Sequence, residues 1–424
     1  MASMIRIVAG TYEGLLYGWE LPTAAAKGKK MKLTFGYSAH SECIKSVSLM
    51  TAKQGKTLIS GGNDETIKYG HLLGFLVEWW VGIDGSWWIL IYNVNKRVEV
   101  GTLMEHKGAV TCLEFFGQSH MLSGSADNSI CIWRTADWNC LHILGGHKGE
   151  VTSMAVHPSG KLAFSVARDR TLRMWNLVKG RIAYIRRLEK EASLVKMSQT
   201  GSRYALCFGT ELSVFSSANA EVVGTLDHGD KIHAAAFATD EYIVCGGEDK
   251  YIYVWKTNGT LMAKVTNEEI TSRIRCIEVV YPHGEDDLPW IVVATSNGRV
   301  MVWDLAEFSL DALAPEEANT DVKPLTSAMI LSKPRVTCLS ACVVTADGSD
   351  DAEPKVKKVK KVKKAPAVKP LSAAESAAAP RVVVELDEPT PSAPKKTKQN
   401  KKRKANDAPS SQKQKKKGKP GKKQ

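Results

Sequence analysis

The chain has 424 residues, of which 43% are hydrophobic and 24% charged, so it is long enough for two or three globular domains or one large repeat architecture. Its formal charge of +13 is unevenly distributed, because residues 345–424 hold 23 Lys and Arg against 9 Asp and Glu, a balance of +14 that leaves −1 for the first 344 residues. This division excludes a uniformly basic protein that coats nucleic acid. It indicates a near-neutral body, residues 1–344, followed by a cationic tail, residues 345–424.

Nine cysteines are scattered through apolar stretches, and no two of them form a CxxC pair. An odd number of cysteines without metal-ligand spacing favours reduced, buried thiols in the cytosol or nucleus, so we expect neither disulfides nor a metal site. The N-terminal sequence MASMIRIVAG has no charged segment followed by an apolar run, and we expect no secretory signal.

A sequence repeat organises the body. An acidic residue recurs six positions before an aromatic residue that ends a strand-like run, and the aromatic residues Trp133, Trp175, Phe215 and Trp255 lie 42, 40 and 40 residues apart. A His precedes each of the three Trp residues by 27 or 28 positions. This spacing is typical of WD40 propeller blades, and the short β segments alternate with turn sequences such as HPSG. We therefore predict an all-β fold, a seven-bladed WD40 β-propeller.

The recurring polar residues predict a buried hydrogen-bond network in each blade. The Asp would accept from the His, the His would engage a hydroxyl, and the hydroxyl would accept from the Trp indole N–H. Such a network is favourable only when every member is satisfied, which explains why the residues recur together. Ser, His and Asp also form hydrolase triads, but their repetition in several blades argues against catalysis. The predicted network residues are His106, Ser123, Asp127 and Trp133; His147, Ser165, Asp169 and Trp175; and His228, Asp249 and Trp255, with Ser60 as the corresponding hydroxyl of the first blade.

Six blades can be counted along the chain, and the seventh is expected to be shared by the two ends of the body. Residues 5–21 resemble the later strands of a blade whose first strand would be residues 335–344. Such a closure removes the exposed edges of an open array. The fourth blade is degenerate, with Gly209 in the Asp position and Phe215 in the Trp position. The six blades begin near His40, His106, His147, Lys190, His228 and Asn267.

One segment interrupts the repeat. In the first blade Asp64 precedes its aromatic partner, Tyr92, by 28 residues instead of six, and the surplus of 22 coincides with residues 69–90. Removal of that segment would leave the regular sequence NDETIKIYNV, so we favour non-native sequence such as a translated intron. Two alternatives stay open: a genuine insertion that covers a propeller face and binds an apolar partner, and a membrane segment, which Glu78, Asp84 and four glycines disfavour.

The tail has the composition of a disordered segment, because Lys, Ala, Pro and Ser dominate it. With few aromatic residues and a high charge, it cannot bury enough apolar surface to offset the chain entropy of folding. Its Lys clusters resemble a nuclear import signal and would bind RNA phosphates through counterion release, without sequence readout because no aromatic residues interleave them. The alternative is a tail that only improves solubility. The predicted import residues are Lys395, Lys396, Lys401, Lys402, Arg403 and Lys404.

The sequence favours an interaction scaffold over an enzyme. It contains no GxxxxGK[ST] phosphate loop, no HExxH zinc motif and no GxSxG nucleophile elbow, so we assign no catalytic residue and no cofactor. Charged residues beside the network, in turns expected to face solvent, are candidates for a partner-binding face; the alternative is that they are ordinary solvated charges. These residues are Lys107, Lys148, Arg168, Lys231 and Glu248.

Residues 122–185, LSGSADNSICIWRTADWNCLHILGGHKGEVTSMAVHPSGKLAFSVARDRTLRMWNLVKGRIAYI, resemble the PAK-interacting proteins and their fungal relatives named for maintenance of killer virus. The opening VAGTYEGLLYGWEL, the SGGNDETIK turn, the weak fourth blade and the Lys-rich tail fit the same family, whereas residues 69–90 do not. The resemblance implies a nucleolar assembly factor for the large (60S) ribosomal subunit, with pre-ribosomal proteins and rRNA as partners. It also implies, in animals, an inhibitor of PAK-type kinases, and a kinase-binding signalling scaffold in the cytoplasm is the alternative function. We expect a monomer within a larger assembly and no membrane association.

Overall fold

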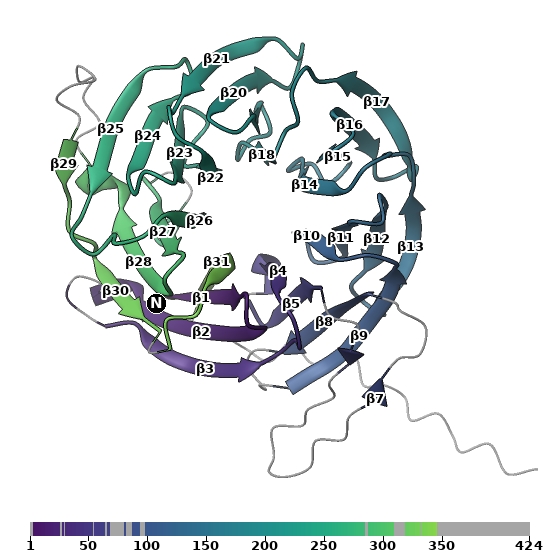
Figure 1. The fold of residues 1–424 in the computed structure, drawn as a ribbon, viewed down its shortest axis with the longest axis horizontal. Coiled ribbons are helices and arrows are strands. Elements are labelled where there is room, and N and C mark those ends of the chain that lie inside the picture. Colours follow the sequence, from purple (N-terminus) through teal and green to yellow (C-terminus); the bar gives the residue numbers. More distant parts are fainter. Residues whose placement is uncertain are drawn as a thin grey trace, which may run out of the picture. The chain divides into compact units, whose positions relative to one another are not determined.

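The computed structural model describes residues 3–345 except 26–27, 29, 54, 64–65, 68–79, 82–86, 94–97, 285–286, 309–318 and 331. The described residues lie in a compact unit, Met1–Ala352, and the second unit, Glu353–Gln424, lies outside them. The described strands form seven sheets of four or five strands, arranged in a ring, and one two-stranded pair (Figure 1). The prediction of an all-β propeller is confirmed.

The strands of each sheet follow one another from the inside of the ring to its rim, and each neighbouring pair is antiparallel except β25 with β29. Sheets 1 and 2 contain β4 (Ile44–Leu49), β5 (Thr57–Gly62), β8 (Trp87–Asn93) and β9 (Val98–His106), then β10 (Val110–Phe116), β11 (His120–Ser125), β12 (Ile130–Arg134) and β13 (Asn139–Leu144). Sheets 3 and 4 contain β14 (Val151–Val156), β15 (Leu162–Ala167), β16 (Thr171–Asn176) and β17 (Arg181–Arg187), then β18 (Leu194–Met197), β19 (Arg203–Cys207), β20 (Glu211–Ser216) and β21 (Val222–Asp227). Sheets 5 and 6 contain β22 (Ile232–Phe237), β23 (Tyr242–Gly247), β24 (Ile252–Lys256), β25 (Leu261–Thr266) and β29 (Asn319–Asp321), then β26 (Ile274–Val280), β27 (Trp290–Thr295), β28 (Arg299–Asp304) and β30 (Thr326–Met329). Sheet 7 contains β31 (Val336–Thr345), β1 (Ser3–Thr11), β2 (Leu15–Pro22) and β3 (Lys32–Ser38), and the separate pair consists of β6 (Thr66–Ile67) and β7 (Trp80–Val81).

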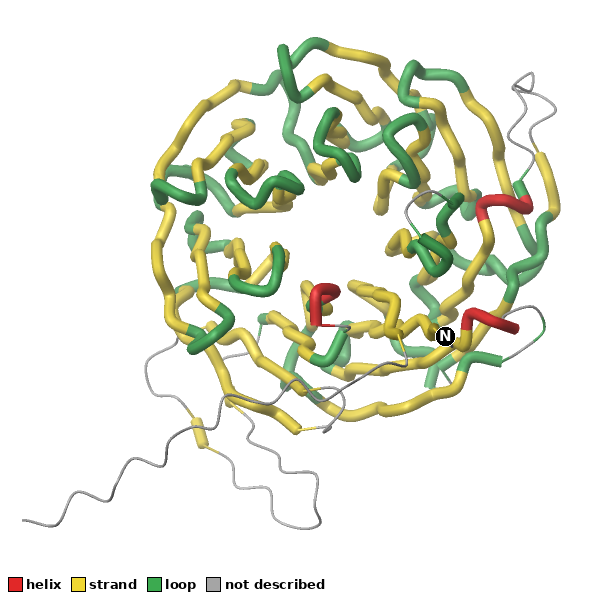
Figure 2. Tube along the Cα trace, turned by 180° about the vertical axis from the view of Figure 1, so that it is seen from behind, coloured by secondary structure: helices red, strands yellow, loops and turns green. Residues whose placement is uncertain are grey.

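Helix is confined to three short 3-10 segments within the described residues, as the view from behind shows (Figure 2). They are η1 (Thr23–Ala25), η2 (Thr51–Lys53) and η3 (Leu305–Glu307). No helix among the described residues combines the length and the apolar character needed to cross a membrane. All nine cysteines lie in the described part of the chain and carry free thiols.

The middle strands of the sheets are apolar on both faces because each sheet packs between two others, whereas outer strands such as β17 are largely exposed. Every residue of β27 is buried, and its side chains contribute to two different cores: Val292 packs with Ile5 and Ile7 of sheet 7, whereas Val293 packs with residues of sheet 5. This double burial explains why the strands read as nearly continuous apolar runs in the sequence.

The two ends of the described chain lie side by side in sheet 7. Strand β31 pairs with β1 over its whole length, from Thr345 opposite Ser3 to Val336 opposite Thr11. Thr337 ties this sheet to sheet 1, since its hydroxyl donates to the carbonyl of Ile44. The ring is therefore closed by hydrogen bonds between the first and last strands.

The segment 69–90 contributes to sheet 1. Strand β5 pairs directly with β8, with Ser60 opposite Leu90 and Thr57 opposite Asn93. Residues 87–90 thus occupy strand positions that residues 65–68 would take if residues 69–90 were removed. Most of the remaining segment lies outside the described residues, and the three hypotheses about its origin stay predictions.

Candidate functional site

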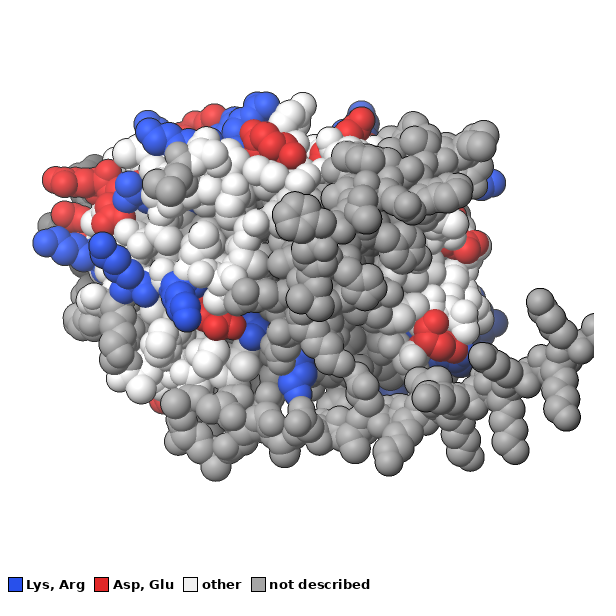
Figure 3. Space-filling model, turned by 90° about the horizontal axis from the view of Figure 1, so that it is seen from below, with Lys and Arg blue, Asp and Glu red and all other residues white. Residues whose placement is uncertain are grey.

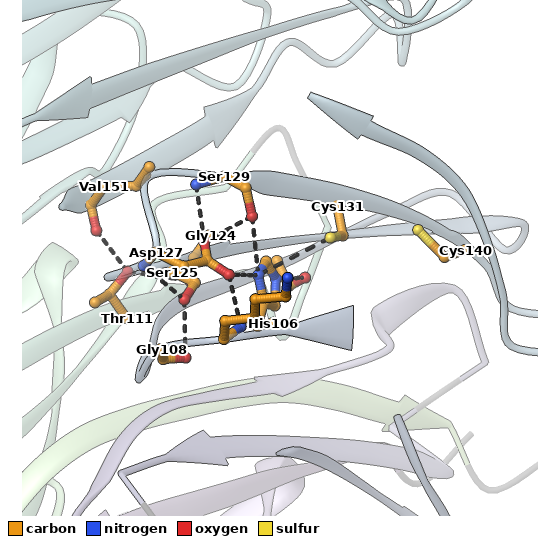
Figure 4. A network of polar contacts seen from close by, with 12 residues as sticks. His106, Gly108, Thr111, Gly124, Ser125, Asp127, Ser129, Cys131, Cys140 and Val151 are labelled. Carbon is orange, nitrogen blue, oxygen red and sulfur yellow. Dashed lines mark hydrogen bonds and ion pairs between the residues drawn. The ribbon is translucent and has the colours of Figure 1, made fainter. Parts of the chain in front are cut away.

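The predicted polar residues of sheet 2 meet in one buried network. Figure 4 labels its His106 and Asp127, together with Ser129 and Cys131 beside them. His106 lies with Nε2 2.7 Å from the Ser123 hydroxyl and Nδ1 3.1 Å from the Asp127 carboxylate. The indole Nε1 of Trp133 donates to the same Ser123 oxygen at 2.8 Å. The side chains of His106 and Ser123 are almost completely buried, so every hydrogen bond here replaces one that water would provide.

Sheet 3 repeats this arrangement with nearly the same distances. His147 lies 2.7 Å from the Ser165 hydroxyl and 3.0 Å from the Asp169 carboxylate. Trp175 donates to Ser165 at 2.8 Å. In sheet 1, Nε2 of His40 lies 2.8 Å from the Ser60 hydroxyl. The repetition makes this network a structural element of the ring and gives no one sheet a distinct reactive site.

The Asp of each network also holds a tight turn. Asp127 accepts from the backbone N–H two residues later at 2.9 Å, and Asp169 does the same at 3.0 Å. The residue between has a positive φ in both cases, 70° at Asn128 and 57° at Arg170, a conformation that such side-chain-to-backbone bonds stabilise. One carboxylate therefore joins the turn to the buried His.

Burial and hydrogen bonding set the charge states in these networks. Burial acts to raise the pKa of Asp169, but hydrogen bonds from Thr171, the Lys148 N–H and His147 outweigh it and lower the pKa to about 2. The pKa of Asp127 is held below its usual range in the same way. Burial lowers the pKa of His147, and Asp169 only partly opposes this effect. The network of sheet 3 therefore pairs a carboxylate with a neutral imidazole at pH 7.

Sheet 5 departs from this arrangement. Cys245 stands where the other sheets have Ser, and its Sγ lies 3.9 Å from Nδ1 of His228. The His228 ring instead presents Nε2 to Asp249, at 3.2 Å. Among the described residues, Trp255 Nε1 and Asp249 Oδ2 are buried without a hydrogen bond of normal geometry. The Trp255 indole still acts on the Cys245 thiol, where it opposes the rise in pKa that burial causes, and Tyr253 acts on Asp249. The three residues predicted for this sheet are close together, but the series from Trp to His is interrupted at the thiol.

The predicted partner-binding residues are all exposed, in turns at the same end of their sheets as the network Asp residues. Two of them are engaged in ion pairs. Arg168 Nε lies 3.1 Å from Glu150, and Glu248 lies 2.7 Å from His233 and 3.3 Å from Arg273. The remaining three predicted residues are Lys107, Lys148 and Lys231. On the side of the ring in Figure 3, the described basic and acidic side chains are interspersed, in keeping with the near-neutral body.

Three charged residues on inner strands, Lys196, Glu278 and Glu114, were not predicted from the sequence. Lys196 of β18 lies 4.0 Å from Glu278 of β26, and each side chain is 35% exposed. Glu278 is the first cause of a raised pKa at Lys196, and Glu114 of β10 contributes in the same direction. A comparison of the repeats that looked for differences between them would have found these residues.

No group of three His, Cys, Asp or Glu within the described residues is arranged to hold a metal ion. The predicted import residues 395–404 lie outside the described residues.

Known proteins that share the repeat identify the family of this chain. The family model for the WD domain, G-beta repeat, matches residues 97–134, 138–176 and 220–256, each of which ends close to a network Trp. Over 338 residues the chain is 32% identical to the p21-activated protein kinase-interacting protein 1-like of Gallus gallus, a match that covers 79% of this chain and 80% of the relative. The chain belongs to this WD40 family.

The family of p21-activated-kinase-interacting proteins extends to fungi. The chain is 24% identical over 356 residues to Protein MAK11 of Saccharomyces cerevisiae, covering 72% of this chain and 78% of that protein. It is 28% identical over 319 residues to Shk1 kinase-binding protein 15 of Schizosaccharomyces pombe, covering 71% of this chain and 78% of that protein. The resemblance inferred from residues 122–185 is confirmed, and several members of the family are named for binding a kinase.

Proposed function

We propose that this protein is a non-enzymatic WD40 scaffold that acts in nucleolar biogenesis of the large (60S) ribosomal subunit. The observation that carries the proposal is the separation of charge: a body of −1 over 344 residues and a tail of +14 over the rest. Pre-ribosomal particles present dense phosphate, to which a Lys-rich tail binds by releasing counterions, while a near-neutral ring can bind proteins. The protein would act as a monomer within that assembly, without a cofactor.

Several finer features belong to the same proposal. All seven sheets would be blades of one ring, with sheet 1 completed by strand β8. The exposed residues Lys107, Lys148, Arg168, Lys231 and Glu248 would contact pre-ribosomal proteins. Charge reversal at Lys148 and Arg168 together should weaken association with pre-ribosomes without a change in melting temperature. Unchanged co-sedimentation of this variant with the particles would remove these residues from the interface.

Affinity purification of the tagged full-length protein tests the assembly role. We expect large-subunit precursors to co-purify at moderate salt and the RNA-dependent fraction to decline at high salt, because phosphate contacts weaken as salt rises. A variant with the tail lysines replaced by Gln is the matched control, and it should retain protein partners while losing salt-sensitive RNA. Absence of ribosomal precursors from both samples would contradict the proposal.

The localisation part of the proposal rests on the Lys clusters of the tail. Fusion of residues 345–424 to a fluorescent protein should give nuclear and nucleolar signal. Replacement of Lys395, Lys396 and residues 401–404 by Ala should return the fusion to the cytoplasm. A wild-type fusion that stays cytoplasmic would refute nuclear import through this tail.

A second function is favoured by the names of the relatives, which describe binding to p21-activated kinase and to Shk1 kinase. In this alternative the chain is a scaffold that binds and negatively regulates a PAK-type kinase. The same purification distinguishes the two functions, since recovery of a kinase without ribosomal precursors would support the second and contradict the first. A basic tail has no required role in kinase binding, which is why we place this function second.

A further inference from the structure

The inner strands of six sheets contain a β-bulge near their first residue, and the bulged residues can be compared around the ring. In each case the pairing with the next strand skips one residue, as between Val110 and Cys112 of β10. A bulge turns its side chain out of the regular alternation of the strand. The bulged residues are Lys45, Thr111, Thr152, His233, Arg275 and Thr337 in sheets 1, 2, 3, 5, 6 and 7.

Where the bulged residue is Thr, its side chain reaches the start of the inner strand of the next sheet or the segment just before it. Thr152 donates to the carbonyl of Ala192 at 3.1 Å, and Thr111 donates to the carbonyl of Val151. The bulge position therefore points along the inner circumference of the ring. In sheets 5, 6 and 1 the same position carries His233, Arg275 and Lys45, so a hydroxyl that joins two sheets is replaced by a longer basic side chain.

A second position, two residues before the bulge, shows the same asymmetry. It holds Lys231, Arg273 and Arg335 in sheets 5, 6 and 7, but Ala109 and Glu150 in sheets 2 and 3. The carbonyl at this position accepts from the turn between the second and third strands, for example Glu248 N–H to Lys231 at 3.1 Å, which places all these residues at one end of the ring. Four consecutive sheets thus contribute Lys45, Lys231, Arg273, Arg275 and Arg335, which we call the cationic arc.

The charges of the arc converge. Burial raises the pKa of the Cys43 thiol, and the negative charge of Glu13 acts in the same direction. The positive charges of Lys45, Arg275 and Arg335, from three different sheets, act in the opposite direction. The charge of Arg275 also acts on Cys338 in sheet 7. Arg275 of sheet 6 is therefore close enough to act electrostatically on sheet 7 and on the start of sheet 1.

Most of the arc is not neutralised within the protein. Arg273 pairs with Glu248, and the guanidinium of Arg335 lies 4.3 Å over the ring of Tyr12. Over the residues that the structure describes, the side chains of Lys45, Lys231 and Arg275 have no hydrogen bond or ion pair. Two exposed acidic residues, Glu13 and Glu42, flank the arc, and Glu13 accepts from the backbone N–H of Arg335.

We propose that the cationic arc binds an acidic segment of a partner protein, with carboxylate or phosphate oxygens received by Arg275, Lys45 and Arg335. Guanidinium groups bind such oxygens through two parallel hydrogen bonds, and Lys45 adds a mobile charge beside them. Arg335 is held in place by Tyr12 and loses little freedom on binding. This inference stands apart from the proposed role in ribosome assembly, and neither depends on the other.

A peptide suits the arc better than RNA. Single-stranded RNA is held by aromatic side chains on which successive bases stack. Tyr12 borders the described part of the arc, and Arg335 already covers one face of its ring. Charge without a stacking platform matches an extended acidic polypeptide.

Residue-resolved lysine acetylation of the full-length protein tests the proposal without interference from binding to the tail. Limited acetylation, read by mass spectrometry at each lysine, is measured against increasing concentrations of a short oligoglutamate peptide and of its phosphoserine counterpart. We expect about threefold or greater protection of Lys45, with no protection of Lys107 or Lys148, which lie at the same end of the ring outside the arc. An oligouridylate of equal charge is the competing probe.

Two variants complete the test. Arg275→Ala should raise the peptide concentration needed for half-maximal protection of Lys45 about tenfold, which is the effect of losing one charge-assisted contact. Arg275→Lys should raise it less, because the charge is kept. Arg168→Ala, which removes an exposed arginine outside the arc, is the matched control and should change nothing. Equal acetylation of Lys45 with and without peptide would overturn the proposal, as would unchanged protection in Arg275→Ala at an unchanged melting temperature. Protection by oligouridylate but not by either peptide would overturn the choice of a protein partner.

Discussion

The interrupted network of sheet 5 predicts that Cys245→Ser stabilises the protein, against the usual effect of placing a hydroxyl in a core. Among the described residues, Trp255 Nε1 is buried beside the Cys245 thiol, a weak acceptor, without a hydrogen bond of normal geometry, whereas the equivalent Trp175 donates to Ser165 at 2.8 Å. A hydroxyl at position 245 would accept from Trp255, which removes a penalty of about 1–3 kcal/mol for an unsatisfied buried donor. Burying the hydroxyl costs roughly 1–2 kcal/mol, so the midpoints of the two ranges give a net gain of about 0.5 kcal/mol.

Urea denaturation of the full-length protein, followed by tryptophan fluorescence, measures this change as a higher midpoint at an unchanged slope. The reciprocal variant Ser165→Cys is the control, because it removes the oxygen shared by Trp175 and His147 and should destabilise sheet 3 by about 1–3 kcal/mol. Cys245→Ala separates loss of the thiol from gain of the hydroxyl and should lower the midpoint. A lower midpoint for Cys245→Ser, or no change for Ser165→Cys, would show that the shared hydroxyl does not govern the stability of these networks.

Three further predictions concern pH, residues 69–90 and ring closure. Because burial lowers the pKa of His147, the unfolded state takes up a proton first, so this residue contributes stability fully above about pH 6.5 and loses it as the pH falls toward the folded pKa. Urea midpoints should therefore fall between about pH 7.5 and 5.5, and His147→Gln should flatten the decline; parallel curves would assign the decline to other groups. Deletion of residues 69–90 should leave a folded protein of similar melting temperature, since residues 65–68 can supply the third strand of sheet 1, and loss of soluble protein would indicate a native structural role. Truncation after Pro334 should lower the melting temperature by more than about 10 °C relative to truncation after Thr345, because it removes β31, and equal melting temperatures would contradict closure by that strand.

Repetition made the fold readable from the sequence. The His, Ser, Asp and Trp residues of sheets 2 and 3 are spaced identically within one position, so each copy supports the interpretation of the other. The pairing between the ends of the body followed from one strand-like stretch, residues 335–344, that had no blade of its own. The inclusion of residues 87–90 in strand β8 could not be predicted from the sequence. Strand register depends on which of two apolar runs packs between the neighbouring sheets.

The interrupted network of sheet 5 and the cationic arc were harder to predict from the sequence, because both depend on departures from the repeat. Cys245 follows the same spacing as Ser123 and Ser165, but spacing alone does not show that the His228 ring turns its other nitrogen toward Asp249. The cationic arc rests on β-bulges, and a bulge shifts the alternation of a strand by one residue without a clear sequence signal. Lys45 and Arg275 therefore read as ordinary surface charges until the register of their strands was known.

The closure of sheet 7 has a consequence for folding kinetics. Ser3 lies opposite Thr345, a contact between residues separated by nearly the whole body, whereas hairpins such as β15–β16 join residues only a few positions apart. Local hairpins form first, and the pairing with the greatest sequence separation pays the largest loop-closure entropy, so we expect it to be completed last, after the transition state for folding. Interactions formed after the transition state chiefly determine how slowly a protein unfolds. The lifetime of the folded ring should therefore be set at its seam, and substitutions in β1 and β31 should change the unfolding rate more than equally buried substitutions elsewhere.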